Sequence, residues 1–72
     1  MFPTREEAIE MFARYFEARH RSGAVERAKQ RASSLAAKGD HEGHKIWIAV
    51  ARRVEALRQE DRVALRRAKE RT

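Results

Sequence analysis

Hydrophobic residues recur along this chain at intervals of three and four positions, the spacing that places side chains on one face of an α-helix. The pattern fills three stretches, which are separated only by short breaks around Gly23 and Gly39. Strand-forming residues are few and alanine is abundant, which favours helix throughout. We predict an all-α fold, a small three-helix bundle in which the second and third helices form an antiparallel hairpin.

The first predicted helix begins after Thr4. The Thr4 side chain can accept a hydrogen bond from the backbone N–H of Glu7, and the Glu7 side chain can reach back, which is the arrangement called a capping box. Gly23 is the predicted end of this helix, because glycine readily adopts the left-handed conformation that ends helices. One face of the helix carries Ile9, Phe12, Ala13, Phe16 and His20.

The second predicted helix runs from Ala24 to about Lys38. Its apolar stripe is mostly alanine, so it permits close approach of a neighbouring helix but fills little volume. Trp47, in the next helix, is predicted to fill the remaining space against Ala28 and Ala32 and to be shielded from water. The stripe consists of Val25, Ala28, Ala32, Leu35 and Ala36.

The third predicted helix is capped by Asp40, directly after Gly39 ends the second. It continues to Arg71 without glycine or proline after its first turn, so it would be about 45 Å long against about 22 Å for the second helix. It therefore either overhangs the hairpin or frays at its end. We predict a three-helix domain at 1–58 and a basic extension of the third helix at 59–72. The predicted core consists of Ile9, Phe12, Phe16, Val25, Ala28, Ala32, Leu35, Trp47, Val50, Val54 and Leu57.

Length and composition place narrow limits on this domain. A chain of 72 residues forms one domain near the lower size limit, with a core that rarely contributes more than about 3–5 kcal/mol. There is no cysteine, which excludes a disulfide or a thiolate zinc site. No apolar run approaches the roughly 18 residues of a membrane span, and the first residues do not resemble a signal peptide. We predict a cytoplasmic protein that does not associate with membranes.

The formal net charge is +6, and arginine outnumbers lysine. Such a balance suits nucleic acid or an acidic partner. A coding bias that enriches arginine and alanine together would give the same balance, and acidic residues are mixed among the basic ones along most of the chain. Charge alone leaves open whether the positive surplus is functional.

The sequence HEGH holds two histidines, His41 and His44, three positions apart. Residues at this spacing lie close together on a helix, but zinc requires a third and a fourth ligand. The metalloprotease signature also differs, since its two histidines lie four positions apart. No nucleophile motif or glycine-rich phosphate loop is present, and a domain this small lacks a deep pocket. We predict no metal, no cofactor, no small-molecule substrate and no enzymatic activity.

The stretch GDHEGHKIWIAVARRVEAL resembles a recurring pattern, Gly-Asp-x-Glu-Gly-x-x-x-Trp-x-x-Val-Ala, of small uncharacterised helical proteins from bacteria and phages. The opening EEAIEMFARYFEARH is similar to their first helix. Because that family, a domain of unknown function, has no assigned activity, the resemblance implies a helical fold and no chemistry. Its matched residues read as structural, and Gly43 would leave room for a crossing helix or an aromatic ring. The matched positions are Gly39, Asp40, Glu42, Gly43 and Trp47.

The first helix carries more apolar residues than one flank of a bundle needs. With Ala8, Met11, Tyr15 and Ala18 its apolar arc widens to roughly 220°, against about 100° for an ordinary surface helix. These residues either form the rim of the core or contact a protein partner, for which a symmetric homodimer is the commonest solution. The candidate partner surface consists of Met11, Tyr15, Ala18, Ile48 and Leu65.

The alternative function is nucleic-acid binding by the long basic third helix, since an arginine-rich helix fits the major groove. The link Lys38-Gly39-Asp40 indicates a tight reversal, unlike the perpendicular turn of a helix-turn-helix. We therefore expect a protein–protein interaction or self-association module, with a basic nucleic-acid-binding module as the alternative. The candidate nucleic-acid contacts are Arg52, Arg62, Arg66, Arg67 and Lys69.

Overall fold

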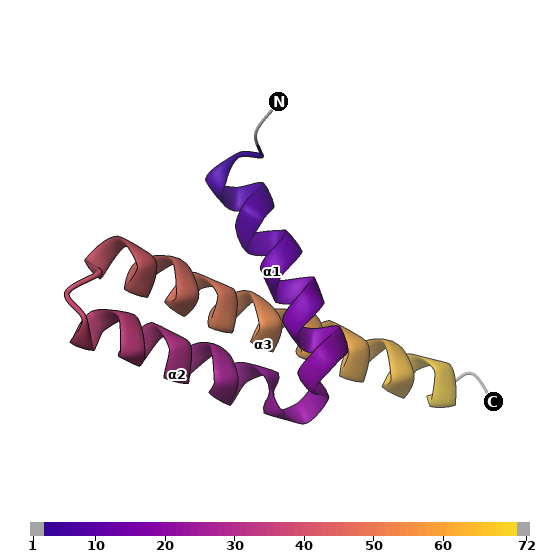
Figure 1. Cartoon of the computed structure of the whole chain (residues 1–72). Helices are drawn as coiled ribbons and strands as arrows, with labels where there is room; N and C mark the ends of the chain where they lie inside the picture. Colours follow the sequence, from indigo (N-terminus) through magenta and orange to yellow (C-terminus); the bar gives the residue numbers. More distant parts are fainter. Residues whose placement is uncertain (1–2, 71–72) are drawn as a thin grey trace.

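The computed structural model describes residues 3–70 and contains helices joined by short turns (Figure 1). Helix α1 spans Arg5–His20 and leads through a single 3-10 turn, η1 (Arg21–Gly23), into α2 (Ala24–Ala37). Helix α3 spans His41–Glu70. Residues 3–70 contain no strand, so the predicted all-α class is confirmed. The predicted end of the third helix at Arg71 lies outside the described residues.

The reversal between α2 and α3 is built as predicted. Gly39 has a φ of +85°, and its N–H donates to the Ala36 carbonyl at 3.0 Å, while the Asp40 N–H donates to the Leu35 carbonyl at 2.9 Å. These two bonds form a Schellman motif, which satisfies the last carbonyls of α2. The Asp40 carboxylate then caps α3 by accepting the Gly43 N–H at 2.9 Å.

The atoms nearest to Gly43 belong to the cap of its own helix and not to a crossing helix or a ring. A Cβ at this position would lie 2.5 Å from Oδ2 of Asp40. The missing side chain therefore gives space to the carboxylate that caps α3.

The predicted Thr4 cap at the start of α1 is present, since Thr4 Oγ1 accepts the Glu7 N–H at 3.1 Å. The Glu7 carboxylate reaches back as predicted, but it accepts a hydrogen bond from the Thr4 hydroxyl at 3.2 Å, which differs from the backbone bond of a full capping box. The predicted stop at Gly23 is wrong. Helix α1 ends at His20, and Arg21 adopts the positive φ of 51°, while Gly23 keeps a helical φ of −89°. The chain turns at Arg21, which shortens the link and lets α2 follow η1 without a loop.

Helices α2 and α3 run side by side in opposite directions, and α1 crosses them with its N-terminal end pointing away (Figure 1). Helix α3 remains continuous past the hairpin, and residues 59–70 are exposed, so the end of this helix overhangs. The radius of gyration is 14.3 Å, against about 11 Å for a compact chain of this length. The fold is all-α with a long third helix, but it is more open than a compact three-helix bundle.

The core lies where the three helices meet, and small residues dominate it. Five of the eight buried residues are alanine, and no buried residue in 3–70 is larger than leucine. The prediction of Phe12 as a core residue is wrong, because this side chain is 40% exposed. Trp47 is only partly buried at the edge of the core. The buried set is Ala13, Ala24, Ala28, Ala32, Val50, Ala51, Val54 and Leu57.

The alanine faces give the physical reason for these two corrections. Alanines at the crossing let helix backbones approach closely, and a closely spaced interface has no volume for large rings. The rings therefore lie at the open edge of the core. Of the predicted core residues, Ile9, Phe16, Val25 and Trp47 are half-buried and pack against the core. Leu35, also predicted there, is half-buried on α2.

Ion pairs fix α1 across α3. The Arg53 guanidinium donates two hydrogen bonds to the Glu10 carboxylate, of which the Nη2–Oε1 bond measures 3.1 Å. Hydrogen bonding from Arg53 is the main cause that lowers the pKa of Glu10 below its usual value. Glu17 accepts from Arg58 at 3.4 Å further along the same interface. The Arg53–Glu10 pair contributes more to the orientation of α1 on α3 than to the free energy of unfolding, because such partly exposed pairs contribute at most about 1 kcal/mol.

Helices long and apolar enough to cross a lipid bilayer are not found within residues 3–70.

Candidate interaction surface

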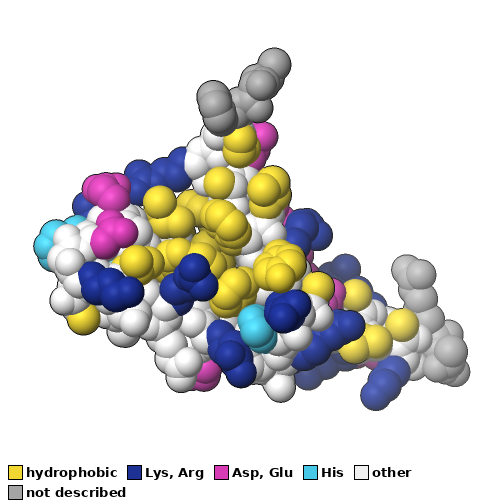
Figure 2. Space-filling view, viewed as in Figure 1, with side chains coloured by type: hydrophobic (Ala, Val, Ile, Leu, Met, Phe, Trp, Pro, Cys, Tyr) yellow, Lys and Arg dark blue, Asp and Glu magenta, His cyan; other side chains and the backbone are white. Residues whose placement is uncertain are grey.

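The large apolar side chains gather on one open face of the molecule, where α1 crosses the hairpin (Figure 2). They line a depression of about 440 Å³, which we call the aromatic groove. Side chains of all three α-helices contribute to it. Its lining residues are Met11, Phe12, Tyr15 and Phe16 of α1, Arg31 of α2 and Trp47 of α3.

Contacts between rings hold the floor of the aromatic groove in place. The Trp47 ring stacks on Phe12 with centroids 5.6 Å apart and an interplanar angle of 30°, and it meets Phe16 at 4.9 Å in a tilted arrangement. The Arg31 guanidinium carbon lies 4.8 Å from the Trp47 ring centroid, a cation–π contact. Phe16 also meets the edge of the His20 ring at 5.0 Å. The floor is therefore pre-organised, because each ring is held by at least one neighbour.

The rim of the aromatic groove is more exposed than its floor. Met11 is 59% and Tyr15 57% exposed, although both are bulky and largely apolar. Aromatic residues, methionine and arginine are the types enriched in protein–protein interfaces. The composition of the groove thus differs from that of an ordinary helix surface.

A second depression of about 430 Å³ continues the aromatic groove along α2 and shares Phe16 and Arg31 with it. Arg27, Arg31 and Lys38 all line it, and no acidic residue lines either depression. We call these three cations the basic wall. Their spacing of four and seven positions places them on one face of α2.

His20 lies at the junction of the aromatic groove and the basic wall. Burial lowers the pKa of the His20 imidazole below its usual value, and the positive charges of Arg27 and Arg19 lower it further. The protonated, positively charged form of His20 is therefore disfavoured, since the side chain is partly buried and the surrounding charge is already positive.

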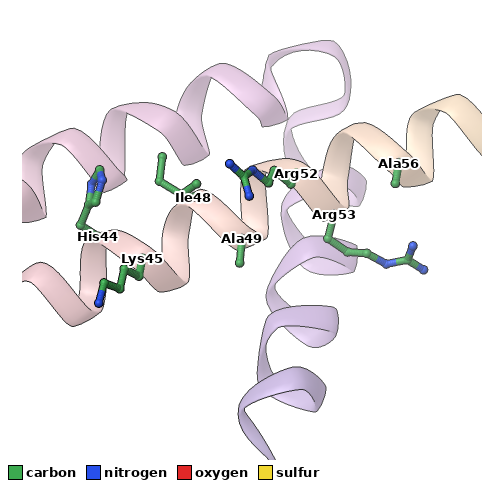
Figure 3. Close-up of a pocket in the computed structure, with 7 residues that line it drawn as sticks. All are labelled: His44, Lys45, Ile48, Ala49, Arg52, Arg53 and Ala56. Atoms are coloured by element: carbon green, nitrogen blue, oxygen red, sulfur yellow. The ribbon is translucent and has the colours of Figure 1, made fainter.

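The structure brings together only part of the predicted partner surface. Met11 and Tyr15 both line the aromatic groove. Ala18 is exposed on α1 outside it, and Leu65 is 65% exposed on the overhanging end of α3. Ile48 is half-buried in a different depression, of about 570 Å³, on the outer side of α3 (Figure 3).

The sequence pattern predicts Phe12, Phe16 and Trp47 as core residues and gives no prediction of the basic wall. One signal was present, because Arg27, Arg31 and Lys38 recur at helical spacing beside the alanine stripe. The pattern gives the face on which a residue lies but not how deeply the neighbouring helix covers it.

The candidate nucleic-acid contacts lie along α3, and all five are exposed. Arg52 lines the depression on the outer side of α3, with Lys45 and Ile48 (Figure 3). Arg62 and Arg66 lie within about 80° of Arg52 around the helix axis, at 100° per residue. The two others are Arg67, beside Val63 in another shallow depression, and Lys69.

The two histidines of HEGH lie in different environments. Nδ1 of His44 lies 2.9 Å from the Ala32 carbonyl oxygen and, as a donor, ties α3 to α2. His41 is exposed in the first turn of α3. Among residues 3–70 no three potential metal-ligating side chains come together.

Comparisons of the chain with protein-family models, with curated proteins and with solved structures find no match.

Proposed function

We propose that the protein is a protein–protein interaction module that binds its partner through the aromatic groove. One observation carries the proposal. Five of the eight buried residues are alanine, whereas Met11, Phe12 and Tyr15 are 40–59% exposed. A helical domain that folds only for its own stability gains most by burying its largest apolar side chains. Here those side chains remain available to a second surface.

Aromatic residues and arginine dominate the energetics of protein–protein contacts. A partner that covers Phe12, Tyr15 and Trp47 would remove bulky apolar surface from water, at about 25 cal/mol per Å². It would also stabilise a domain whose core is small, because binding to the folded state shifts the folding equilibrium.

A second copy of the chain is one such partner. Two copies pairing through α1 would form a symmetric dimer and would close the open side of each subunit into a fuller three-helix bundle. Static light scattering across protein concentration tests this form. A molecular mass that stays monomeric at all concentrations would leave a different protein as the partner.

Site-specific photocrosslinking in the cell that makes the protein tests the proposed function. We expect a photoreactive residue at Tyr15 to form covalent adducts with a protein partner, because Tyr15 lies on the rim of the aromatic groove. The same residue at Ser33 is the control, since Ser33 is exposed on α2 and lines neither depression. No adduct at Tyr15, or equal adducts at Ser33, would contradict the proposal.

The second candidate function is nucleic-acid binding by α3. The observation in its favour is that α3 continues as one helix beyond the hairpin with Arg62, Arg66 and Arg67 exposed. A mobility shift with duplex DNA at two salt concentrations tests it. Phosphate contacts release counterions, so genuine binding weakens steeply between 50 and 200 mM salt, by roughly ninety percent or more for a few contacts. Weak binding that is insensitive to salt would exclude this function.

A further inference from the structure

We infer that the segment bound in the aromatic groove is an amphipathic helix of a partner protein with acidic residues along one edge. Its apolar face would lie on Phe12, Tyr15 and Trp47, and its carboxylates would face the basic wall. The inference rests on the proposed function, to which it adds the chemistry of the partner.

The distribution of ion pairs carries the argument. On the side where α1 meets α3, Arg5, Arg14, Arg53 and Arg58 are each paired with a glutamate of this chain. On the opposite side, no carboxylate within residues 3–70 pairs with a cation of the basic wall. Positive charge without a neighbouring carboxylate therefore lies beside the aromatic groove, where a bound carboxylate would meet the cations of the basic wall.

The dimensions of the site fit a helix. Arg27 and Lys38 are eleven positions apart on α2, which corresponds to about 16 Å or three helical turns. A partner helix lying along α2 would present carboxylates spaced by one and by two turns to the cations of the basic wall, which lie four and seven positions apart. Its apolar residues at intervals of three and four would meet the rings, which is the mode by which amphipathic helices bind grooves. Met11 adapts to differently shaped side chains, because methionine is unbranched and flexible.

The overhanging end of α3 from a second copy fits this site poorly. Residues 59–70 carry Arg62, Arg66, Arg67 and Lys69 against Glu60, Asp61 and Glu70. Like charges facing one another across an interface are unfavourable, so this segment would be repelled by the basic wall.

Single-stranded nucleic acid also fits poorly. Bases bind by stacking on open aromatic faces. The Trp47 ring is already contacted by Phe12 and by the Arg31 guanidinium, so it offers little open face. A peptide helix needs only the edges and the apolar bulk of these rings.

A selection experiment tests the inference without knowledge of the natural partner. The immobilised full chain would select from a library of helical peptides of about 18 residues with fixed apolar positions and randomised flanks. Affinities of selected peptides would be measured by the fluorescence of Trp47, the one tryptophan of the chain. We expect the selected peptides to be rich in glutamate and aspartate on one flank. We also expect replacement of these acids by lysine to weaken binding at least about tenfold.

Charge-reversal variants locate the effect. The double variant Arg27→Glu/Lys38→Glu keeps the cation–π contact of Arg31 and should lose the preference for acidic peptides. The matched control is Lys45→Glu/Arg52→Glu, which changes the net charge by the same amount but on the outer side of α3. This variant should keep the preference for acidic peptides. Circular dichroism would confirm that both variants retain the helix content of the parent chain.

The possible outcomes separate the two proposals. Selected peptides without an acidic bias, or an equal loss in the Lys45→Glu/Arg52→Glu control, would overturn the acidic-helix inference and leave the proposed function standing. No selected peptide, together with tighter binding of a single-stranded oligonucleotide or of vesicles containing phosphatidylglycerol, would overturn the inference in favour of that ligand. The absence of adducts at Tyr15 in the photocrosslinking experiment would instead contradict the proposed function itself.

Discussion

At the scale of single residues, the turn between α1 and α2 places a non-glycine residue in a backbone conformation that favours glycine. Arg21 has a φ of 51°, in a region that disfavours side chains, whereas Gly23 has an ordinary helical φ of −89°. We expect Arg21→Gly to raise the free energy of unfolding by about 0.5–1 kcal/mol, because glycine relieves this backbone strain.

Gly23→Ala should raise the free energy of unfolding similarly, since no atom lies within 4 Å of a Cβ at Gly23 and alanine restricts the unfolded chain. Thermal denaturation measures both effects, as 1 kcal/mol corresponds to about 4–8 °C in a domain of this size. If Gly23 were the left-handed residue, both substitutions would lower the melting temperature, which would contradict the observed turn.

His20 links stability to pH at the same turn. Burial and the nearby Arg27 and Arg19 lower the pKa of His20 in the folded state below its usual value of 6.5. The unfolded chain therefore takes up this proton at a higher pH than the folded one, so the contribution of His20 to stability is complete above pH 6.5 and is lost as pH falls below it. Urea denaturation at pH 7.5 and 5.5 would detect the change. The His20→Gln variant should lose less stability over this range, and an equal loss in the variant would exclude His20 as the cause.

At the scale of elements, the overhanging end of α3 adds length without adding core. Residues 61–70 are all exposed, while Glu60 still pairs with Arg53 at 3.5 Å. We expect a chain that ends at Glu60 to keep cooperative unfolding and a melting temperature within about 8 °C of the full chain, because about 1 kcal/mol or less is removed. Thermal denaturation followed by circular dichroism checks this. A truncated chain that no longer unfolds cooperatively would show that the overhang stabilises the domain.

The same elements show how far sequence reasoning extends. The Gly39–Asp40 reversal and the Thr4 cap could be predicted because short-range hydrogen bonds determine them. The end of α1 could not, since the chain turns at Arg21 although a glycine is available two positions later. A local preference predicts where a turn is easy, but it does not determine by itself which residue turns.

Depth of burial belongs to the whole molecule, and here the sequence was less informative. Helical spacing predicts inward positions for Phe12 and Trp47, yet Phe12 is 40% exposed and Trp47 is only half-buried at the edge of the core. Their exposure depends on how closely the alanine faces of three helices approach one another, which no single helix encodes. The aromatic groove and the basic wall therefore emerge from the crossing of α1 over the hairpin.

The asymmetry of charge across the whole molecule leads to a measurement that needs no partner. Because cations of the basic wall have no carboxylate beside them in residues 3–70, the potential around the half-exposed Trp47 should be positive and attract small anions. We expect iodide to quench Trp47 fluorescence at least about twofold more efficiently than caesium at low ionic strength, a difference that 0.5 M sodium chloride should reduce by screening. In the Arg27→Glu/Lys38→Glu variant, iodide and caesium should quench Trp47 with similar efficiency. In the Lys45→Glu/Arg52→Glu variant, the difference in quenching efficiency should remain. Equal quenching of the parent chain by both ions would mean that the aromatic groove carries no positive field, and the attraction for an acidic helix would then lose its electrostatic basis.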